Sequence, residues 1–241
     1  MAQIIYGRNP IEEAINEGVR MEKVFLLQTV TGPYEKLVRN YCKEHRIPLA
    51  KVPAIKLDKL TKQQNHQGVV GIMPAIEYHQ ISDACAISSD APRVVILENI
   101  TDVRNVGAIG RSALAFDFQA MIVVGGKSAP VNEDAIKASA GALLKLPVCR
   151  GKNVMVVIEE LQQLGYTVYT TSLKTNDHID SIDQSVPIAI IMGAEDKGVS
   201  YDSVKLADGN IKIAQSSQME SLNVSVAAGI VMHELFNKKG L

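Results

Sequence analysis

The stretch Val94-Val-Ile-Leu97 decides the fold of most of this 241-residue chain. An unbroken apolar run of this kind is typical of a parallel strand that helices cover on both faces. Further strands are predicted at 120–124, 148–149, 167–171, 188–192 and 211–213, and helical patterns lie between most of them. One such helix spans 153–164, with Asn153 as its N-cap and Gly165 after its end. This alternation predicts an α/β fold with a mainly parallel sheet and helices on both sides.

The N-terminal third has the pattern of a smaller α/β unit. Short strands are predicted at 4–6, 24–27, 48–52 and 69–73. Asn9-Pro10 reads as an N-cap with proline at the first helical position, and a second helix is predicted at 34–45. The small, polar segment that ends in Ala91-Pro92 is typical of a linker. We therefore expect a first domain at 1–76, a linker at 77–92 and a second domain at 93–241.

Charge is distributed unevenly along the chain. The formal net charge of −1 excludes a generally polycationic nucleic-acid binder. Residues up to Tyr78, however, hold 11 Lys/Arg against 8 Asp/Glu, while the remainder holds 14 against 18. This asymmetry favours contact between the first third and a polyanion, and an ordinary solvated surface is the alternative interpretation.

The cysteine, histidine and hydropathy patterns indicate in which cellular compartment the protein works and whether it binds a metal. The three cysteines, Cys42, Cys85 and Cys149, are far apart and odd in number, which predicts reduced, mostly buried thiols. The histidines do not cluster with cysteines or carboxylates at ligand spacing, so we expect no metal site. The sequence has no apolar stretch of about 18 residues, and it does not start with a basic segment followed by an apolar one. These features predict a soluble, cytoplasmic protein without a membrane segment.

Three segments rich in small residues carry the functional signal. They are Asn105-Val-Gly-Ala-Ile-Gly-Arg111, Gly193-Ala-Glu-Asp-Lys-Gly198 and the stretch from Ile213 to Ser221-Leu-Asn-Val-Ser-Val-Ala227. Each follows a predicted strand, and loops at strand ends are where open α/β sheets bind ligands. The sequence therefore predicts one cleft that is assembled from distant parts of the chain.

Each segment also has a purely structural interpretation. The first is explained equally by an asparagine cap, two packing glycines and a solvated Arg111, which lies off the apolar stripe of its helix. The second is explained by a tight glycine-rich turn with exposed charges. In the third, Ser221 is a plausible N-cap for a long apolar helix that is buried in the core or against a second subunit. Asn223 and Ser225 then need polar partners, either in the loops or in a ligand.

Other motifs fail on inspection. Gly125-Gly-Lys-Ser128 is similar to the end of a phosphate-binding loop, but Met121 stands where that loop requires its first glycine. No G-x-G-x-x-G follows a predicted strand, which argues against a nicotinamide-binding or ordinary Rossmann methyltransferase domain. His66 has no evident catalytic partner in the sequence.

Together and in this order, the three segments resemble the SpoU-type RNA ribose 2′-O-methyltransferases of the SPOUT superfamily. The matching signature is Asn105-x-Gly-Ala-x-x-Arg111, Met192-Gly-Ala-Glu195-x-x-Gly198 and Ser221-Leu-Asn-Val-Ser-Val-Ala227. Tyr6-Gly-Arg-Asn-Pro-Ile-Glu-Glu-Ala14 and His66-Gln-Gly-Val69 resemble the family's N-terminal substrate-binding domain. The resemblance covers nearly the whole chain.

The resemblance implies a deep C-terminal trefoil knot that binds S-adenosylmethionine, an L30e-like N-terminal domain, and a homodimer with the last helix near the interface. It implies a guanosine ribose of 23S ribosomal RNA as the substrate, since family members that act on transfer RNA often lack the N-terminal domain. The implied cofactor contacts are Gly193, Ile213 and Leu222. The implied catalytic and substrate positions are Asn105, Arg111, Glu195, Ser221 and Asn223.

The residue types suit the implied reaction, in which a 2′-hydroxyl loses a proton while it attacks a sulfonium methyl group. Positioning supplies much of the rate in such a displacement. Because an ordinary arginine stays protonated, we expect Arg111 to hold the adjacent phosphate and stabilise the developing alkoxide. Asn105, Ser221 and Asn223 would orient Arg111 and the ribose, and Glu195 would anchor Arg111 or the loop.

The chain departs from the family pattern in two places. Val103 stands where the family usually has proline, and Ile213-Ala-Gln-Ser-Ser217 replaces the usual Ile-Pro-Met-x-Gly. If Ser217 must take the positive φ that glycine adopts freely, the loop is strained by about 1 kcal/mol. Three alternatives stay open: a transfer-RNA ribose methyltransferase, a non-catalytic RNA-binding or ribosome-assembly protein, and a small-molecule α/β enzyme.

Overall fold

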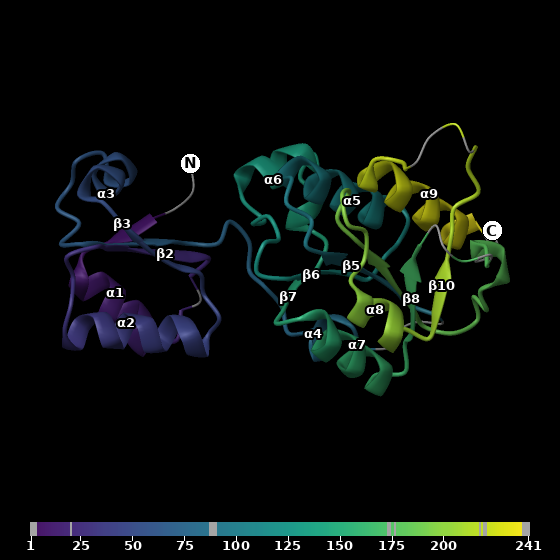
Figure 1. The fold of residues 1–241 in the computed structure, drawn as a ribbon, viewed down its shortest axis with the longest axis horizontal. Helices are drawn as coiled ribbons and strands as arrows, with labels where there is room; N and C mark the ends of the chain where they lie inside the picture. The colour runs from purple at the N-terminus through teal and green to yellow at the C-terminus, as the bar shows by residue number, and fades with distance from the viewer. Residues whose placement is uncertain are drawn as a thin grey trace. The chain divides into compact units, whose positions relative to one another are not determined.

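A computed structural model of the chain describes residues 4–19, 21–86, 91–172, 175, 177–216, 218 and 221–237. The chain forms two compact units, residues 1–75 and 76–241, which are described separately (Figure 1). Part of the segment predicted as a linker, 77–92, packs on the second unit. His79 bridges to Cys149, and the backbone oxygen of Ala84 accepts a hydrogen bond from Gln119 at 3.0 Å.

The first unit is a four-stranded sheet with helices on both faces. The order of strands is β1-β4-β2-β3, in which only β2 and β3 are parallel. Helices α1 and α2 pack on one face of the sheet and α3 on the other. The elements are β1 (Ile4–Tyr6), α1 (Arg8–Asn16), β2 (Lys23–Leu27), α2 (Pro33–Glu44), β3 (Leu49–Val52), α3 (Ala54–Thr61) and β4 (Val69–Ile72).

The structure corrects the predicted start of the first helix and adds one helix that was not predicted. Helix α1 begins at Arg8, with Gly7 rather than Asn9 in the cap position, so Pro10 lies third in the helix. Gly7 has φ 93°, a backbone conformation that suits glycine and lets the chain turn from β1 directly into the helix. The short helix α3 does not follow from the sequence pattern.

The second unit is the predicted α/β domain. Its six strands are all parallel in the order β10-β8-β9-β5-β6-β7. The elements are α4 (Ile81–Ala84), β5 (Arg93–Glu98), α5 (Val103–Ala115), β6 (Ala120–Val124), α6 (Glu133–Ala138), η1 (Ala142–Leu144), β7 (Val148–Gly151), α7 (Val154–Gln163), β8 (Thr167–Thr171), η2 (Ile179–Ser181), β9 (Ile188–Met192), α8 (Tyr201–Leu206), β10 (Gly209–Ile211) and α9 (Val224–Asn237). The mainly parallel sheet is therefore confirmed, and β10 lies two residues earlier than the predicted strand at 211–213.

Strand β5 is the centre of this unit, because every one of its side chains is buried. Val95 and Leu97 join the core under α5, α6 and α9, whereas Val94 and Ile96 join the core under α4 and α7. Figure 1 shows the two helical layers on opposite sides of the sheet. This two-sided burial is why β5 reads as an unbroken apolar run.

Helix α5 is slim on the side that meets α6. A Cβ on Gly107 would lie 2.5 Å from the backbone oxygen of Ala135 and from the Cβ of Ala138. The predicted apolar stripe of α5 is buried at Val106, Ile109, Gly110 and Ala113, but Leu114 stays 38% exposed. The two helices can therefore approach closely only because position 107 has no side chain.

The thiols fit the sequence analysis. Cys42, Cys85 and Cys149 are free and buried, as predicted. Burial raises the pKa of Cys42 to about 11, so this group stays a neutral thiol at ordinary pH. Among the described residues no helix is both long enough and apolar enough to cross a membrane.

We predict opposite effects of alanine at two glycines of packed helices. Gly107→Ala should lower the free energy of unfolding by about 1–3 kcal/mol, because the new methyl group collides with α6. Gly229→Ala is the matched control: its Cβ meets Ser112 Oγ at an ordinary 3.6 Å, and alanine favours a helix over glycine by about 0.5–1 kcal/mol. Urea unfolding of both variants measures these changes in the free energy of unfolding, and equal changes in the two variants would contradict the packing argument.

Candidate functional site

The candidate site lies at the carboxyl ends of β5 and β9. The chain passes from β5 to β6 and β7 on one side of the sheet, and later returns with β8 and β9 on the other side. The connection therefore changes direction between β5 and β9, where open α/β sheets bind their ligands. The residues that follow these two strands include Asn105 at the start of α5 and Glu195 in the turn after β9.

Three polar side chains from distant segments form one hydrogen-bonded cluster. Glu195 Oε1 accepts hydrogen bonds from Asn105 Nδ2 at 3.0 Å and from Asn223 Nδ2 at 2.6 Å. Asn223 Nδ2 also lies 3.2 Å from Asn105 Oδ1. We call these residues the amide–carboxylate cluster. It joins the start of α5, the turn after β9 and the start of α9, so it fixes their relative positions.

Asn223, and not Ser221, caps the last helix. Helix α9 begins at Val224, and Asn223 Oδ1 accepts hydrogen bonds from Ser225 N at 2.9 Å and Ser225 Oγ at 2.6 Å. The expected N-cap at Ser221 is therefore wrong, because the helix begins only at Val224 and the amide of Asn223 reaches its open first turn. The polar groups of Asn223 and Ser225 therefore find their hydrogen-bond partners within the protein.

The turn after β9 is closed so tightly that glycine is required. A Cβ on Gly193 would lie 2.1 Å from Gly198 C and 2.2 Å from Val199 N. Gly198 N donates a hydrogen bond to Ala194 O at 2.7 Å, and Gly198 has φ 65°. This closure holds Glu195 beside the two asparagines.

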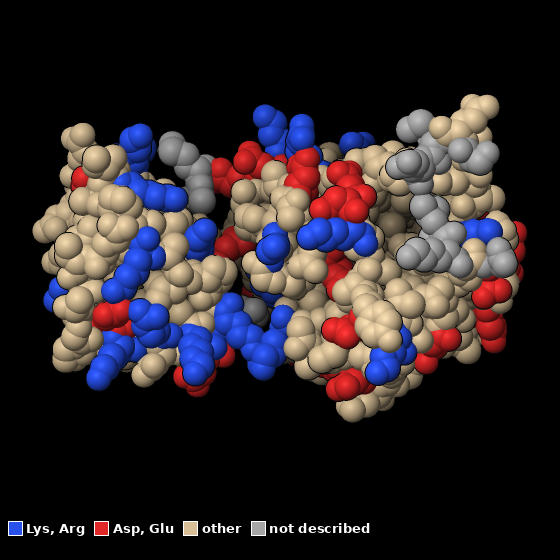
Figure 2. Space-filling view, viewed as in Figure 1, with Lys and Arg blue, Asp and Glu red and all other residues tan. Residues whose placement is uncertain are grey.

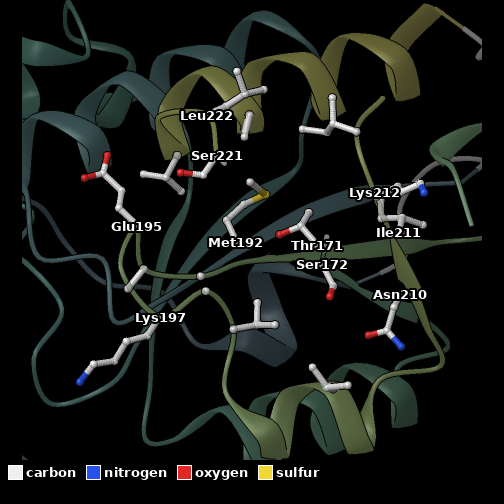
Figure 3. Close-up of a pocket in the computed structure, with 18 of the residues that line it drawn as sticks. Thr171, Ser172, Met192, Glu195, Lys197, Asn210, Ile211, Lys212, Ser221 and Leu222 are labelled. Atoms are coloured by element: carbon white, nitrogen blue, oxygen red, sulfur yellow. The ribbon is translucent and has the colours of Figure 1, made fainter. Parts of the chain in front are cut away.

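A pocket of about 820 Å³ opens beside the cluster (Figure 3). In the figure, Glu195 and Lys197 lie on one side, Asn210 and Lys212 lie on the other, and Leu222 stands over the pocket. Its walls come from the end of β8, the turn after β9, the start of α8, the segment after β10 and the start of α9. A volume of this size with a mixed apolar and polar lining is typical of small-molecule sites.

The structure gathers most of the predicted site residues. The pocket is lined by Gly193, Ile213 and Leu222, the three expected cofactor contacts, and by Glu195 and Ser221. Asn105 and Asn223 reach it through the cluster. Arg111 is not among the lining residues and lies exposed on α5. Ser217, where strain was expected, lies outside the described residues.

Glu98 is a site residue that the sequence analysis missed. It ends β5, is only 3% exposed, and its Oε2 accepts hydrogen bonds from Ser200 N at 3.0 Å and Ser203 Oγ at 2.7 Å. Glu98 therefore holds the start of α8, which forms one wall of the pocket. A carboxylate directly after an apolar strand was the available signal, but its partners are about a hundred residues away.

The residues do not suggest a metal site. Within the described parts of the chain, no group of three or more His, Cys, Asp or Glu side chains could hold a metal ion. The polar groups that are present are amides, hydroxyls and single carboxylates, which suit the orientation of an organic ligand by hydrogen bonds.

Comparison with known proteins identifies two family models along the chain. The SpoU rRNA Methylase family matches residues 92–233, and the model described as RNA 2′-O ribose methyltransferase substrate binding matches residues 4–79. A protein of Mycobacterium ulcerans named as an uncharacterized tRNA/rRNA methyltransferase is 32% identical, and the match covers 98% of this chain and 77% of that protein.

Two solved structures share the fold. The AdoMet-bound rRNA methyltransferase from Sinorhizobium meliloti superposes with a TM-score of 0.63 and 23% identity, and covers 99% of this chain and 87% of that one. The TrmH/SpoU tRNA modifying enzyme of A. aeolicus gives a TM-score of 0.57 and 24% identity, and covers 66% of this chain and 80% of that one.

We predict that Glu98 supports the pocket by holding α8. Glu98→Ala should lower the free energy of unfolding by about 1–3 kcal/mol, because Ser200 N loses its carboxylate acceptor and the buried Ser203 hydroxyl keeps only Ser200 Oγ as a partner. Glu98→Gln keeps an acceptor oxygen and should cost clearly less. Urea unfolding of both variants is the measurement, and an equal loss in the two would contradict the assignment.

Proposed function

Because the chain belongs to the SpoU rRNA methylase family and is thus an RNA methyltransferase, we propose that it transfers a methyl group from S-adenosylmethionine to a ribose 2′-hydroxyl. The proposed target is a guanosine of 23S ribosomal RNA in the cytoplasm. One observation carries the proposal: residues from three distant segments line one pocket beside the amide–carboxylate cluster.

The pocket fits S-adenosylmethionine in its size and in the chemistry of its lining. When bound, this cofactor supplies an electrophilic methyl group on a sulfonium centre. Met192, Ile213 and Leu222 offer apolar surface, and the hydroxyls of Thr171 and Ser172 offer polar contacts. We assign the cofactor contacts to Gly193, Ile213 and Leu222. Sulfonium-bearing S-adenosylmethionine is present in the related structure from Sinorhizobium meliloti, which supports this assignment.

The proposed roles of the polar residues follow from their contacts. Glu195 accepts hydrogen bonds from both asparagine amides, so we assign it to positioning Asn105 and Asn223 rather than to anchoring Arg111. The two asparagines and Ser221 then orient the ribose. The guanidinium of Arg111 would bind the adjacent phosphate and stabilise the alkoxide that develops on the 2′-oxygen.

The N-terminal unit supports ribosomal RNA over transfer RNA as the substrate. The related rRNA methyltransferase aligns with 99% of the chain, whereas the tRNA modifying enzyme aligns with 66%. Since the substrate-binding model matches residues 4–79, the extra length corresponds to a unit that contacts RNA. We further propose that this unit has an L30e-like fold.

We propose that the C-terminal part of the second unit forms a trefoil knot. Strand β10 lies at one edge of the sheet, yet the chain returns from it to α9, which packs against α5 near the middle. His178 also forms a parallel bridge with Lys212, so the loop after β8 and the returning segment lie side by side. The return of the chain to α5 and its pairing with the loop after β8 support a knotted path.

A methyl-transfer assay tests the proposed function. The protein should transfer label from S-adenosylmethionine to 23S ribosomal RNA from cells that lack it, at one ribose. Arg111→Ala should lower the rate at least about 100-fold, as loss of transition-state charge stabilisation does elsewhere. Lys137→Ala, which removes another exposed cation on the same helical layer, should keep full activity.

Three outcomes of this assay contradict parts of the proposal. Label on transfer RNA alone would exclude the ribosomal substrate. No label on either RNA, with no binding of S-adenosylmethionine by calorimetry, would favour a non-catalytic RNA-binding protein. Full activity of the Arg111→Ala variant would exclude the role given to this residue.

We propose a homodimer through α9. Its side chains Val226 and Ile230 are one turn apart and stay 52% and 37% exposed, and a paired apolar surface of this kind marks an interface. Val226→Asp with Ile230→Asp should therefore give a monomer by light scattering at micromolar concentration. Val156→Asp on α7, where the side chain is 43% exposed, should stay dimeric. A monomeric unmodified protein would refute the proposal.

A further inference from the structure

The first unit carries its positive charge unevenly. Residues 8–17 and 33–46, which include α1 and α2, hold five Lys/Arg against five Glu. The opposite face of the sheet, where α3 packs, presents four lysines, Lys23, Lys56, Lys59 and Lys62, and the single carboxylate of Asp58. Figure 2 shows more basic than acidic side chains over this unit. Most of the net positive charge of the unit therefore belongs to the α3 side.

The lysines of the α3 side lack acidic partners. In the described part of the chain none of them forms an ion pair with a carboxylate within 4 Å, and Asp58 of the same helix lies 3.2 Å from His66 Nε2. On the α2 side, by contrast, Glu35 pairs with both Arg39 and Lys51. Among the described residues, the lysine charges on the α3 side are thus not paired with carboxylates.

Two of these lysines contact the same aromatic ring. Lys23 Nζ lies 5.1 Å and Lys56 Nζ lies 5.0 Å from the centroid of Phe25. Each contact is favourable by itself, because the face of the ring is negative. Two ammonium groups on one ring nevertheless repel each other, and a bound anion such as a phosphate would relieve this repulsion.

A hollow of about 530 Å³ lies at the other two lysines of the α3 side. Lys59, Lys62 and Gln63 line it together with Asp58 and with Ile55, an apolar side chain that is 70% exposed. The hollow therefore combines cations with an apolar surface. This combination suits a nucleic acid, whose phosphates need cations and whose sugars and bases offer apolar contact.

The backbone at the end of α3 is left-handed. Lys62, at the C-cap, and Gln63 have φ 53° and 64°, the left-handed conformation that favours glycine. Glycine is the usual residue at such a helix end. A lysine at this position retains a charge at a conformational cost, as happens at binding sites.

We propose that Lys23, Lys56, Lys59 and Lys62, the α3 lysine face, bind the phosphate backbone of the RNA substrate, with Ile55 against a sugar or base. The inference rests on the proposed function for the identity of the ligand as RNA. It adds which side of the first unit meets the RNA and which residues do so.

Salt-dependent binding of the full chain to an unmodified 23S ribosomal RNA transcript tests the proposal. The triple variant Lys56→Gln, Lys59→Gln, Lys62→Gln should bind at least about tenfold more weakly near 100 mM KCl. The slope of its plot of log Kd against log salt concentration should be smaller by about two to three, since each phosphate contact contributes about 0.7–0.9 to this slope. The matched control, Lys36→Gln, Arg39→Gln, Lys43→Gln on α2, has the same change in net charge and should shift the slope by less than about one.

Two results would overturn the proposal. One is an unchanged slope in the α3 variant, and the other is an equal loss in both variants, which would mean unspecific attraction. Loss of self-association in place of RNA binding would assign the face to a second copy of the chain, whose larger unit is acidic. Methyl transfer by the unmodified protein is a separate readout. If transfer fails but the salt dependence of RNA binding is still weaker in the α3 variant, only the proposed reaction is wrong.

A single substitution separates RNA binding from folding. Lys62→Gly relieves the left-handed strain and removes one charge, so it should raise the Tm while it weakens RNA binding. Gln63→Gly relieves the same kind of strain without a change in charge, and should raise the Tm with unchanged binding. Stronger or equal binding by the Lys62→Gly variant would contradict a phosphate contact at this position.

Discussion

The site depends on one oxygen atom, Glu195 Oε1, which accepts hydrogen bonds from Asn105 and Asn223. These residues lie about 90 and 28 positions from Glu195 in the sequence. Because a carboxylate oxygen bonded by two amides has little freedom, the starts of α5 and α9 are held against the turn after β9. The walls of the pocket therefore keep their places without a ligand, which is the preorganisation that positioning catalysis needs.

Close backbone contact is the second constraint on the same region. Gly193 lets the turn after β9 fold against Val199, and Gly107 lets α5 approach α6. Buried Glu98 then fixes α8 on the opposite wall. Small residues and one buried carboxylate thus set the shape of the pocket, whereas the residues that line it supply the contacts to a ligand.

The two units separate two physical tasks. The smaller unit has lysines on the α3 side that form no ion pair among the described residues, and attraction to phosphates there would supply affinity without base specificity. The larger unit is acidic by sequence and relies on short hydrogen bonds between amides and a carboxylate. A polyanionic substrate would then be captured mainly by the first unit and oriented by the second.

The sequence alone determined the α/β class, the parallel strands around Val94–Leu97 and the three segments of the site, because hydrophobic periodicity and small residues at strand ends are local signals. Only the tertiary structure decided that Asn223 rather than Ser221 caps α9, that Glu98 holds α8, and that Arg111 lies away from the pocket lining. These features depend on contacts between residues far apart in the chain. A hydrogen-bond partner or a buried face exists only once the backbone has brought such segments together.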